Sequence, residues 1–519
     1  MASKIFMGDM PELMENILNN LNDDTYELYQ CALVSRHWCR ISIPMIWQDP
    51  FKYFNQDAPF IPEYFSSLGE DEKFILKEHG INIESSKTLF DYARFLNNLD
   101  LHNLENNTKT WIESYMAYLK PYNGPLINHI SNLLLKLFIE SGATLHQLNI
   151  YSEFIKIKSE IFHSLEQNVQ FFSRLQVLSF GTISGEISIT LLKILTNHST
   201  KISDLKLDGF YYEPQVTRGR IELYPNSQVF HELVRFIKSQ EQLKKFTMSS
   251  TEFAEEFHGI VLALECQKQS LQEVIIEGCN YSTEFEILRK CENLKTLRLR
   301  YCNDESLLEV LDIKINTLEV MKTTIEASML VLVFEKVSTS LQRLKLESRD
   351  TIIVEQSLLT DALMSFCPNI TYLDIADIEF STQFLDLISN LQKLQFLTLG
   401  YIEFIDVSDE DVSDEELVIQ FAEILPSTLQ YLDLRNSCLD SYIDIILNNC
   451  YAPLKKLIIH KLDDKKNAKA VIKFCKRKGT LNYVGVDNYW ESSFNSLKME
   501  GYVDRYVTMG PYEDIYVEC

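Results

Sequence analysis

Residue types that could do chemistry are scattered along this chain and form no complete catalytic motif. His231-Glu232-Leu233 matches half of the HExxH zinc-peptidase motif, but a second histidine is missing at the required offset. No Cys-x-x-Cys pair is present for a zinc ribbon or a redox site. Glycine-rich phosphate loops are also absent, in a sequence with only 16 glycines. We therefore expect no catalysis by this chain, and neither a metal nor a cofactor.

Composition narrows the class of protein further. The chain has 519 residues, a formal net charge of -25, 46% hydrophobic residues and 11% aromatic residues. This apolar content is typical of globular proteins, and the charge argues against a general binder of nucleic acid or anionic membranes. No apolar run of about 18 residues and no secretory leader are found. We expect a soluble protein of the cytoplasm or nucleus, with its cysteines as free thiols.

A short apolar pattern, L-x-x-L-x-L with apolar substitutes, recurs along most of the chain. After an outlying LNNLDL at Leu96, most copies follow one another at intervals close to the roughly 20–29 residues of leucine-rich repeats. The thirteen copies are LHQLNI at 145, LQVLSF at 175, ISDLKL at 202, LKKFTM at 243, LQEVII at 271, LKTLRL at 294, LEVMKT at 318, LQRLKL at 341, ITYLDI at 370, LQFLTL at 394, LQYLDL at 429, LKKLII at 454 and LNYVGV at 481.

Each copy predicts a short strand followed by a helix. Side chains alternate along a strand, so the fourth and sixth residues of a copy point inward and the residues between them point outward. The intervening stretches 305–315 and 361–369 have the apolar spacing of helices. One unit cannot bury its apolar face alone, so the units are expected to stack. The predicted fold is an α/β solenoid, with a concave parallel sheet and helices on its convex side.

The first fifty residues have a different pattern. MPELMENILNNL, residues 10–21, predicts a helix with a proline in its first turn. Asp24-x-x-Glu27 resembles a capping box and would begin a second helix. That helix carries Val34 and Trp38 on one stripe, and a third short segment ends at Trp47. Three helices in about forty residues bury little surface, so this unit needs support from a neighbour.

This segment resembles an F-box, through its Met-Pro-Glu-Leu start, its Val-x-Arg-x-Trp centre and its closing tryptophan. The cysteines fit the positions expected in such repeats. Three precede predicted strands, namely Cys291, Cys367 and Cys450, and three follow them, namely Cys279, Cys302 and Cys438. We interpret them as small buried residues, as in the cysteine-containing repeats often found behind F-boxes. The chain is thus similar to the F-box/leucine-rich-repeat family, particularly to its fungal members.

The resemblance implies a function. In that family the F-box binds a Skp-type adaptor of a cullin–RING (SCF-type) ubiquitin ligase, and the repeats hold the protein to be ubiquitylated. The alternative is an interaction scaffold whose F-box-like segment recruits no ligase. For Trp38 and Trp47, filling the core of the three-helix unit is an equal alternative to adaptor contact. The positions that match the family's adaptor-binding residues are Met10, Pro11, Leu13, Ile17, Leu18, Leu28, Val34, Trp38 and Trp47.

The predicted organisation has four parts. Residues 7–51 form the F-box, and residues 52–95 form an irregular or helical joint. Residues 96–490 form the solenoid of about 13–14 units. Residues 491–519 either cap the last repeat or form a tail.

A basic stripe is the predicted substrate site. Five of nine outward positions in the copies at 294, 318 and 341 carry Lys or Arg, which would suit an acidic or phosphorylated segment. The alternative is that they are ordinary solvated strand residues. The five are Arg298, Arg300, Lys322, Arg343 and Lys345.

The segment 406–416, DVSDEDVSDEE, is predicted to be an acidic, self-repelling loop. It is a solubilising insertion or a kinase target at Ser408 and Ser413. A Ca²⁺ site is the third alternative, although the segment lacks the glycine and the spacing of an EF-hand loop.

Overall fold

The computed structural model describes most of the chain and divides it into two compact units. The first unit comprises Met1–Met248 and Ala254–Gln267, and the second comprises Ser249–Phe253 and Lys268–Cys519. The described residues are 11–21, 24–52, 58–81, 88–115, 124–151, 156–181, 185–208, 212–217, 220–225, 227–249, 257–279, 283–302, 314–323, 325–349, 352–404, 413–462, 465–486, 503, 505–514 and 517.

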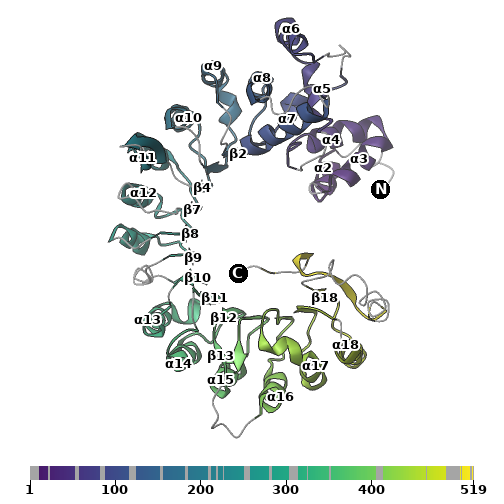
Figure 1. Ribbon diagram of the computed structural model, residues 1–519, viewed down its shortest axis with the longest axis vertical. Coiled ribbons are helices and arrows are strands. Elements are labelled where there is room, and N and C mark those ends of the chain that lie inside the picture. Colours follow the sequence, from purple (N-terminus) through teal and green to yellow (C-terminus); the bar gives the residue numbers. More distant parts are fainter. Residues whose placement is uncertain are drawn as a thin grey trace. The chain divides into compact units, whose positions relative to one another are not determined.

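The first unit begins with helices and continues as alternating strands and helices. Within it, the helices lie outside the strands (Figure 1). Its helices are α2 (Pro11–Asn19), α3 (Thr25–Val34), α4 (Arg36–Ile46), α5 (Ile61–Phe65), α6 (Glu70–Glu78), η1 (Tyr92–Phe95), α7 (Leu101–Tyr115), α8 (Gly124–Glu140), α9 (Ser159–Gln167), η2 (Val169–Phe172), α10 (Gly185–His198), α11 (Ser227–Ser239), α12 (Phe257–Ala263) and η3 (Leu264–Gln267).

The strands of the first unit are parallel and follow the chain. The order is β1-β2-β3-β4-β7, and Leu99, Leu148 and Leu178 align in the register. An antiparallel hairpin of β5 and β6 accounts for the long interval between the copies at 202 and 243. The strands are β1 (Asn98–Asp100), β2 (Gln147–Ile150), β3 (Val177–Phe180), β4 (Asp204–Asp208), β5 (Tyr212–Thr217), β6 (Arg220–Pro225) and β7 (Lys245–Ser249).

The second unit continues the alternation. Its helices, like those of the first unit, lie outside its strands (Figure 1). They are η4 (Thr283–Lys290), α13 (Ala327–Val337), η6 (Ser338–Ser340), α14 (Gln356–Phe366), α15 (Thr382–Asn390), α16 (Asp414–Ile424), η7 (Cys438–Tyr442), α17 (Ile443–Asn449), α18 (Lys465–Lys478) and η8 (Tyr512–Asp514).

The strands of the second unit form a parallel sheet in the order β8-β9-β10-β11-β12-β14-β16-β17-β18-β19, and β13 pairs separately with β15. They are β8 (Glu273–Glu277), β9 (Thr296–Arg300), β10 (Thr317–Thr323), β11 (Arg343–Ser348), β12 (Tyr372–Ala376), β13 (Glu379–Phe380), β14 (Phe396–Gly400), β15 (Glu403–Phe404), β16 (Tyr431–Asp433), β17 (Lys456–Ile459), β18 (Tyr483–Val486) and β19 (Thr508–Pro511).

The predicted apolar triples form the core of both units. In the copy at 294, for example, Leu294, Leu297 and Leu299 are at most 2% exposed. The outlying copy at Leu96 also forms a strand, β1, with its leucines buried. The predicted α/β solenoid with a parallel sheet is therefore confirmed.

The prediction is wrong in one copy. The pattern places Leu318 as the first leucine of LEVMKT, but β10 aligns Leu318 with Leu297 and Val320 with Leu299. The true copy is INTLEV at 315, so Val320 is fully buried and Glu319 points outward. A copy that starts at 315 and a copy that starts at 318 both fit the repeat length. The sequence pattern alone therefore did not identify Glu319 as an outward residue.

Several strands of the second unit end at a left-handed residue. Gly278 follows β8 with φ 69°, Tyr301 follows β9 with φ 55°, and Tyr401 follows β14 with φ 48°. L side chains rarely adopt this conformation. Each amide is held by a neighbouring carbonyl: Gly278 N donates to Arg300 O at 2.8 Å, and Tyr301 N donates to Met321 O at 2.9 Å. The ladder therefore fixes a conformation that the side chains disfavour.

The interpretation of the repeat cysteines is confirmed by their burial. Cys279, Cys291, Cys302, Cys367 and Cys450 are fully buried free thiols, and Cys438 is half-buried. Burial raises the pKa of Cys291 to about 11 and the pKa of Cys367 to about 12. These thiols remain protonated at neutral pH.

Among the described residues, no helix is long and apolar enough to cross a membrane.

Candidate functional site

The N-terminal helices α2, α3 and α4 pack around a very small core. Met14 and Leu18 from α2 and Leu28 from α3 are buried at its centre, and Trp38 packs against them half-buried. Asp24 caps α3 by accepting a hydrogen bond from the amide of Glu27 at 3.0 Å, as the sequence predicts. Ser35 caps α4 in the same way, from the amide of Trp38. Two caps thus fix the turns that bring the three helices together.

The same helices leave large apolar side chains in solvent. On α2, Leu13 and Ile17 are 39% and 45% exposed and lie one helical turn apart. On α3, Leu33 and Val34 are more than 60% exposed. Large apolar side chains exposed on a small helical unit are candidates for contact with another protein. We call this set the F-box apolar surface: Leu13, Ile17, Tyr26, Tyr29, Leu33 and Val34.

The predicted adaptor-binding residues divide into two groups. Leu13, Ile17 and Val34 belong to the F-box apolar surface. Leu18 and Leu28 are fully buried, so their side chains hold the core together and are not available to an adaptor. This corrects the prediction for these two positions. Pro11 is the first residue of α2, whereas Met10 lies outside the described residues. Tyr26, Tyr29 and Leu33 were missed, although all three lie on the predicted second helix.

Trp47 packs against the joint segment. Its ring stacks on Tyr92 at a centroid distance of 4.1 Å and meets Tyr64 edge-on at 5.2 Å. Just after it, the carbonyl of Gln48 accepts hydrogen bonds from the amides of Asn97 and Asn98, at 2.9 and 3.0 Å. The end of the predicted F-box is therefore tied to the edge strand β1. Of the two alternatives for Trp47, this packing favours a structural role.

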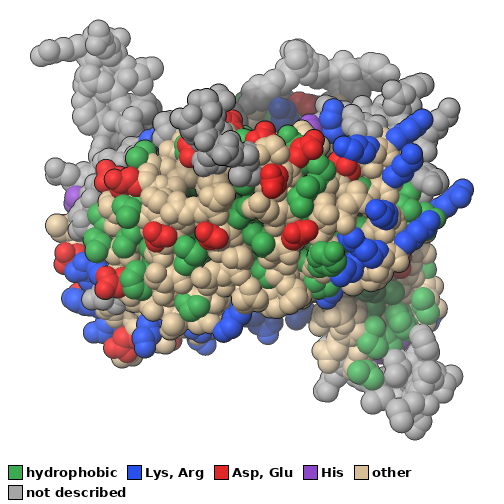
Figure 2. Space-filling model, turned by 90° about the horizontal axis from the view of Figure 1, so that it is seen from below, with side chains coloured by type: hydrophobic (Ala, Val, Ile, Leu, Met, Phe, Trp, Pro, Cys, Tyr) green, Lys and Arg blue, Asp and Glu red, His purple; other side chains and the backbone are tan. Residues whose placement is uncertain are grey.

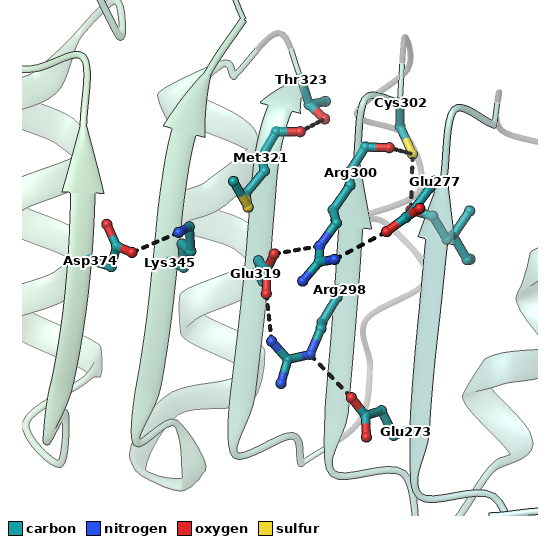
Figure 3. A network of polar contacts seen from close by, with 11 residues as sticks. Glu273, Glu277, Arg298, Arg300, Cys302, Glu319, Met321, Thr323, Lys345 and Asp374 are labelled. Atoms are coloured by element: carbon teal, nitrogen blue, oxygen red, sulfur yellow. Dashed lines mark hydrogen bonds and ion pairs between the residues drawn. The ribbon is translucent and has the colours of Figure 1, made fainter. Parts of the chain in front are cut away.

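The outward face of β8, β9 and β10 carries an ion-pair network centred on Glu319 (Figure 3). Glu319 is 1% exposed and lies 2.7 Å from Arg298 Nη1 and 2.6 Å from Arg300 Nε. Arg298 Nε also pairs with Glu273 at 3.1 Å, and Arg300 Nη1 pairs with Glu277 at 3.1 Å. The two arginines are thus bound on both sides by carboxylates of neighbouring strands.

The electrostatics of Glu319 follow from this geometry. Burial raises the pKa of a carboxyl group, but the hydrogen bonds and charges of Arg300 and Arg298 outweigh it. The pKa of Glu319 is therefore held below its ordinary value. At neutral pH Glu319 is ionised and neutralises cations that the sequence alone assigns to a ligand.

The rest of the predicted basic stripe is also engaged within the chain. Lys322 Nζ lies 2.6 Å from Glu347, and Lys345 Nζ lies 2.8 Å from Asp374. Arg343 stacks over the ring of Tyr372 at 4.3 Å. The structure thus gives Arg298, Arg300, Lys322, Arg343 and Lys345 intramolecular partners. The hypothesis that they form an open anion-binding stripe is not supported, because carboxylates from adjacent strands already occupy most of these cations.

Comparison with known families supports the assignment of the N-terminal helices. A family model described as F-box-like matches residues 11–53. The chain combines an F-box-like domain with leucine-rich repeats. The repeats are assigned from the chain's own buried triples and parallel register. No curated protein sequence matches the chain. Both modules bind other proteins, so the chain is a protein-interaction adaptor.

Three solved structures are similar to this chain at low identity. An internalin from Listeria monocytogenes is 17% identical, covering 63% of this chain and 69% of that chain, with a TM-score of 0.28. A leucine-rich repeat-containing protein from Legionella pneumophila is 16% identical, covering 61% and 92%, with a TM-score of 0.32. A leucine-rich-repeat protein from Leptospira interrogans is 12% identical, covering 72% and 97%, with a TM-score of 0.34.

The acidic segment between two leucine-rich repeats is partly helical. Ser413 caps α16 by accepting a hydrogen bond from the amide of Glu416, and the first turn of α16 is acidic. Carboxylates are favourable at a helix N-terminus. This part of the segment therefore begins a helix and is not the predicted loop. Ser408 lies outside the described residues.

The last long helix of the repeats, α18, is basic throughout its exposed face. It has no acidic residue, and Lys465, Lys469 and Lys473 are exposed. Figure 2 shows Lys and Arg side chains gathered at one edge of the face it displays. Arg477 donates to the carbonyls of Leu447, Asn448 and Cys450 at 2.6–2.7 Å, closing the end of α17. This helix is therefore locally basic, although the net charge of the whole chain is -25.

Proposed function

We propose that this chain is the substrate-recognition subunit of an SCF-type cullin–RING ubiquitin ligase. In this proposal the F-box-like domain binds a Skp-type adaptor, and the leucine-rich repeats bind the protein to be ubiquitylated. The chain would act in the cytoplasm or nucleus and perform no chemistry itself. The chemistry would belong to the other subunits of the ligase.

One observation supports this proposal most directly: the F-box apolar surface. Leu13, Ile17 and Leu33 are 39–64% exposed, so covering each by a partner would contribute roughly 0.6–2 kcal/mol, the exposed fraction of the value for full burial. The surface also lies on helices whose own core is complete without it, because Met14, Leu18 and Leu28 fill that core. Its side chains can therefore be covered by another protein without rearranging the domain.

Attachment of the domain to the repeats supports the same role. A ligase subunit must hold its cargo at a defined distance from the adaptor. Trp47 stacks on Tyr92, and Gln48 accepts two amides from the start of β1. These contacts join the F-box-like domain to the first repeat within one compact unit.

Co-purification with a Skp-type adaptor tests the proposal. The variant Pro11→Ala/Leu13→Asp places a charge in the apolar surface, and burying it unpaired would cost several kcal/mol. We expect the wild-type chain to co-purify with the adaptor and this variant to lose it. The matched control is Phe74→Asp, which places the same charge at a 62%-exposed phenylalanine on α6. Circular dichroism confirms that each variant is folded.

The same experiment distinguishes the ligase subunit from the alternative, an interaction scaffold that recruits no ligase. If the wild-type chain does not bind any Skp-type adaptor, the F-box-like domain recruits no ligase and the chain is a scaffold. If Phe74→Asp loses the adaptor as completely as the double variant, the contact is not specific to the F-box apolar surface.

A further inference from the structure

A row of aromatic side chains crosses the outward face of the second unit. Tyr372, Phe396, Tyr431 and Tyr483 occupy the same register position on β12, β14, β16 and β18, with Lys456 of β17 between the last two. The ring centroids of Tyr372 and Phe396 are 6.1 Å apart, and those of Phe396 and Tyr431 are 5.7 Å apart. We call these four residues the aromatic row. They lie on the side of the sheet opposite the helices.

The chain's own C-terminal segment lies on this row. Tyr512 and Val517 pack against the cluster formed by Tyr431 and Ile458. The hydroxyl of Tyr372 donates to the carbonyl oxygen of Val517 at 2.9 Å. In Figure 1 the yellow ribbon before the C-terminus lies on the side of the second unit's strands that is opposite the helices. Tyr512 and Val517 therefore contact the sheet at β12, β16 and β17.

Arg435 holds the start of this segment. Its guanidinium group stacks on the ring of Tyr512 at 3.7 Å and pairs with Asp433 at 2.8 Å. Asp433 fixes the orientation of the guanidinium plane, and the plane provides a surface on which an aromatic ring binds. An aromatic residue of another peptide could stack on Arg435 in the same way as Tyr512 does.

The contacts of the segment are those of a bound peptide. They consist of an aromatic ring on a guanidinium plane, an aliphatic side chain on an apolar patch and a backbone carbonyl with a tyrosine donor. Beneath it, Tyr372, Tyr431 and Ile458 are at most 1% exposed, whereas the outward Thr296 and Arg298 of β9 are half-buried. In sequence, two acidic residues, Glu513 and Asp514, follow Tyr512.

We propose that the aromatic row is the peptide-binding site of the repeats, and that Tyr512 and Val517 of the chain's own C-terminal segment occupy it as an internal ligand. The partner is a protein segment of the same chemistry, with an aromatic residue, acidic residues after it and an aliphatic residue about five positions on. It binds after displacing the internal ligand. Only the identity of this partner as a ubiquitylation substrate rests on the proposed function.

Competition of this kind has a measurable signature. If the site is free in only a small fraction of molecules, the apparent dissociation constant is larger by the inverse of that fraction. Weakening the internal ligand therefore tightens the binding of a peptide added from outside. If the segment were a permanent structural cap, weakening it would leave the affinity for the added peptide unchanged, because loosening the cap would create no site.

The test uses a fluorescein-labelled synthetic peptide of residues 508–519, with serine in place of Cys519, and the full chain. We expect Tyr512→Ser to bind the peptide at least tenfold more tightly than the wild-type chain, by fluorescence anisotropy. The matched control is Tyr506→Ser, because Tyr506 is an exposed tyrosine that contacts Lys476 and lies outside the row. It should bind as the wild-type chain does. Adding Phe396→Ser to Tyr512→Ser should abolish the gain.

A second measurement keeps the wild-type chain intact. An excess of the unlabelled peptide should accelerate hydrogen exchange in the chain's own fragment 508–519, which the Cys519→Ser substitution distinguishes by mass from the added peptide. Equal affinity of the wild-type chain and Tyr512→Ser, with unchanged exchange, would overturn the proposal and leave the segment as a fixed cap. Adaptor binding is measured on the same samples, so failure of the proposed function is recorded separately.

Discussion

Trp47 and Tyr92 stack with their ring centroids 4.1 Å apart, which couples the last residue of the F-box motif to the joint segment. The pair is reinforced by the edge-on contacts of Trp47 with Tyr64 and Phe60. Aromatic pairs of this kind contribute about 0.5–1.5 kcal/mol beyond their buried area. The stability of the N-terminal domain therefore depends on a neighbour that the F-box motif does not include.

Replacing Trp47 by alanine tests this dependence. We expect Trp47→Ala to lower the free energy of unfolding by about 2–4 kcal/mol, because the ring leaves a cavity among aromatic neighbours. Trp47→Phe keeps a ring against Tyr92 and should lose less than half of that. Urea denaturation followed by circular dichroism measures both. Equal stability of the two variants would contradict a packing role for the indole.

The ion-pair network makes a prediction about pH. Glu319→Gln leaves Arg298 and Arg300 without their shared carboxylate, and we expect a loss of about 2–4 kcal/mol at pH 7. Because the pKa of Glu319 is lowered in the folded chain, its stabilisation is present above the ordinary glutamate pKa of about 4.3. It is lost as the pH falls through the lower, folded value.

The difference in unfolding free energy between wild type and Glu319→Gln should therefore shrink below about pH 4. Denaturation curves at pH 7 and pH 3.5 measure it. Glu347→Gln is the control, since Glu347 pairs with the more exposed Lys322, and its effect at pH 7 should stay below about 1 kcal/mol. A difference that is constant across this pH range would contradict the assigned role of Glu319.

The left-handed residues after the strands predict an unusual stabilisation. Tyr301 has φ 55° and an exposed side chain, so Tyr301→Gly relieves a conformation that costs roughly 1–2 kcal/mol. Glycine also adds freedom to the unfolded chain, so we expect a net gain of about 0.5 kcal/mol. Tyr451→Gly, at an exposed tyrosine outside the left-handed region, should destabilise instead. Thermal unfolding of both variants provides the comparison, and destabilisation by Tyr301→Gly would contradict the strain.

The strands could be predicted from the sequence because their physics is local. A triple such as Leu294, Leu297 and Leu299 must be buried whatever surrounds it, so its pattern locates β9 directly. At β10, Leu318 fits two registers three residues apart, and only the apolar third position of INTLEV, Val320, separates them. With that register, Glu319 falls beside Arg298 and Arg300 on the neighbouring strand, and the network could have been predicted.

The remaining features depend on contacts between distant parts of the chain. β19 has no L-x-x-L-x-L copy, and its pairing with β18 comes after a long intervening segment. The hydrogen bond between Tyr372 and Val517 spans 145 residues, so no spacing rule predicts it. The burial of Leu18 and Leu28 and the exposure of Tyr29 and Leu33 likewise depend on how three helices pack. Helical periodicity alone did not separate the core from the binding surface.

The central claim is that the F-box apolar surface binds a Skp-type adaptor, and the dissociation constant of that complex tests it most directly. Isothermal titration of the adaptor into the full chain would compare the wild type with Ile17→Asp and with the control Phe74→Asp. We predict that the wild type and Phe74→Asp bind with equal affinity and that Ile17→Asp binds at least about 100-fold more weakly, equivalent to about 2.7 kcal/mol. Equal affinity for all three proteins, or no binding by the wild type, would contradict the claim.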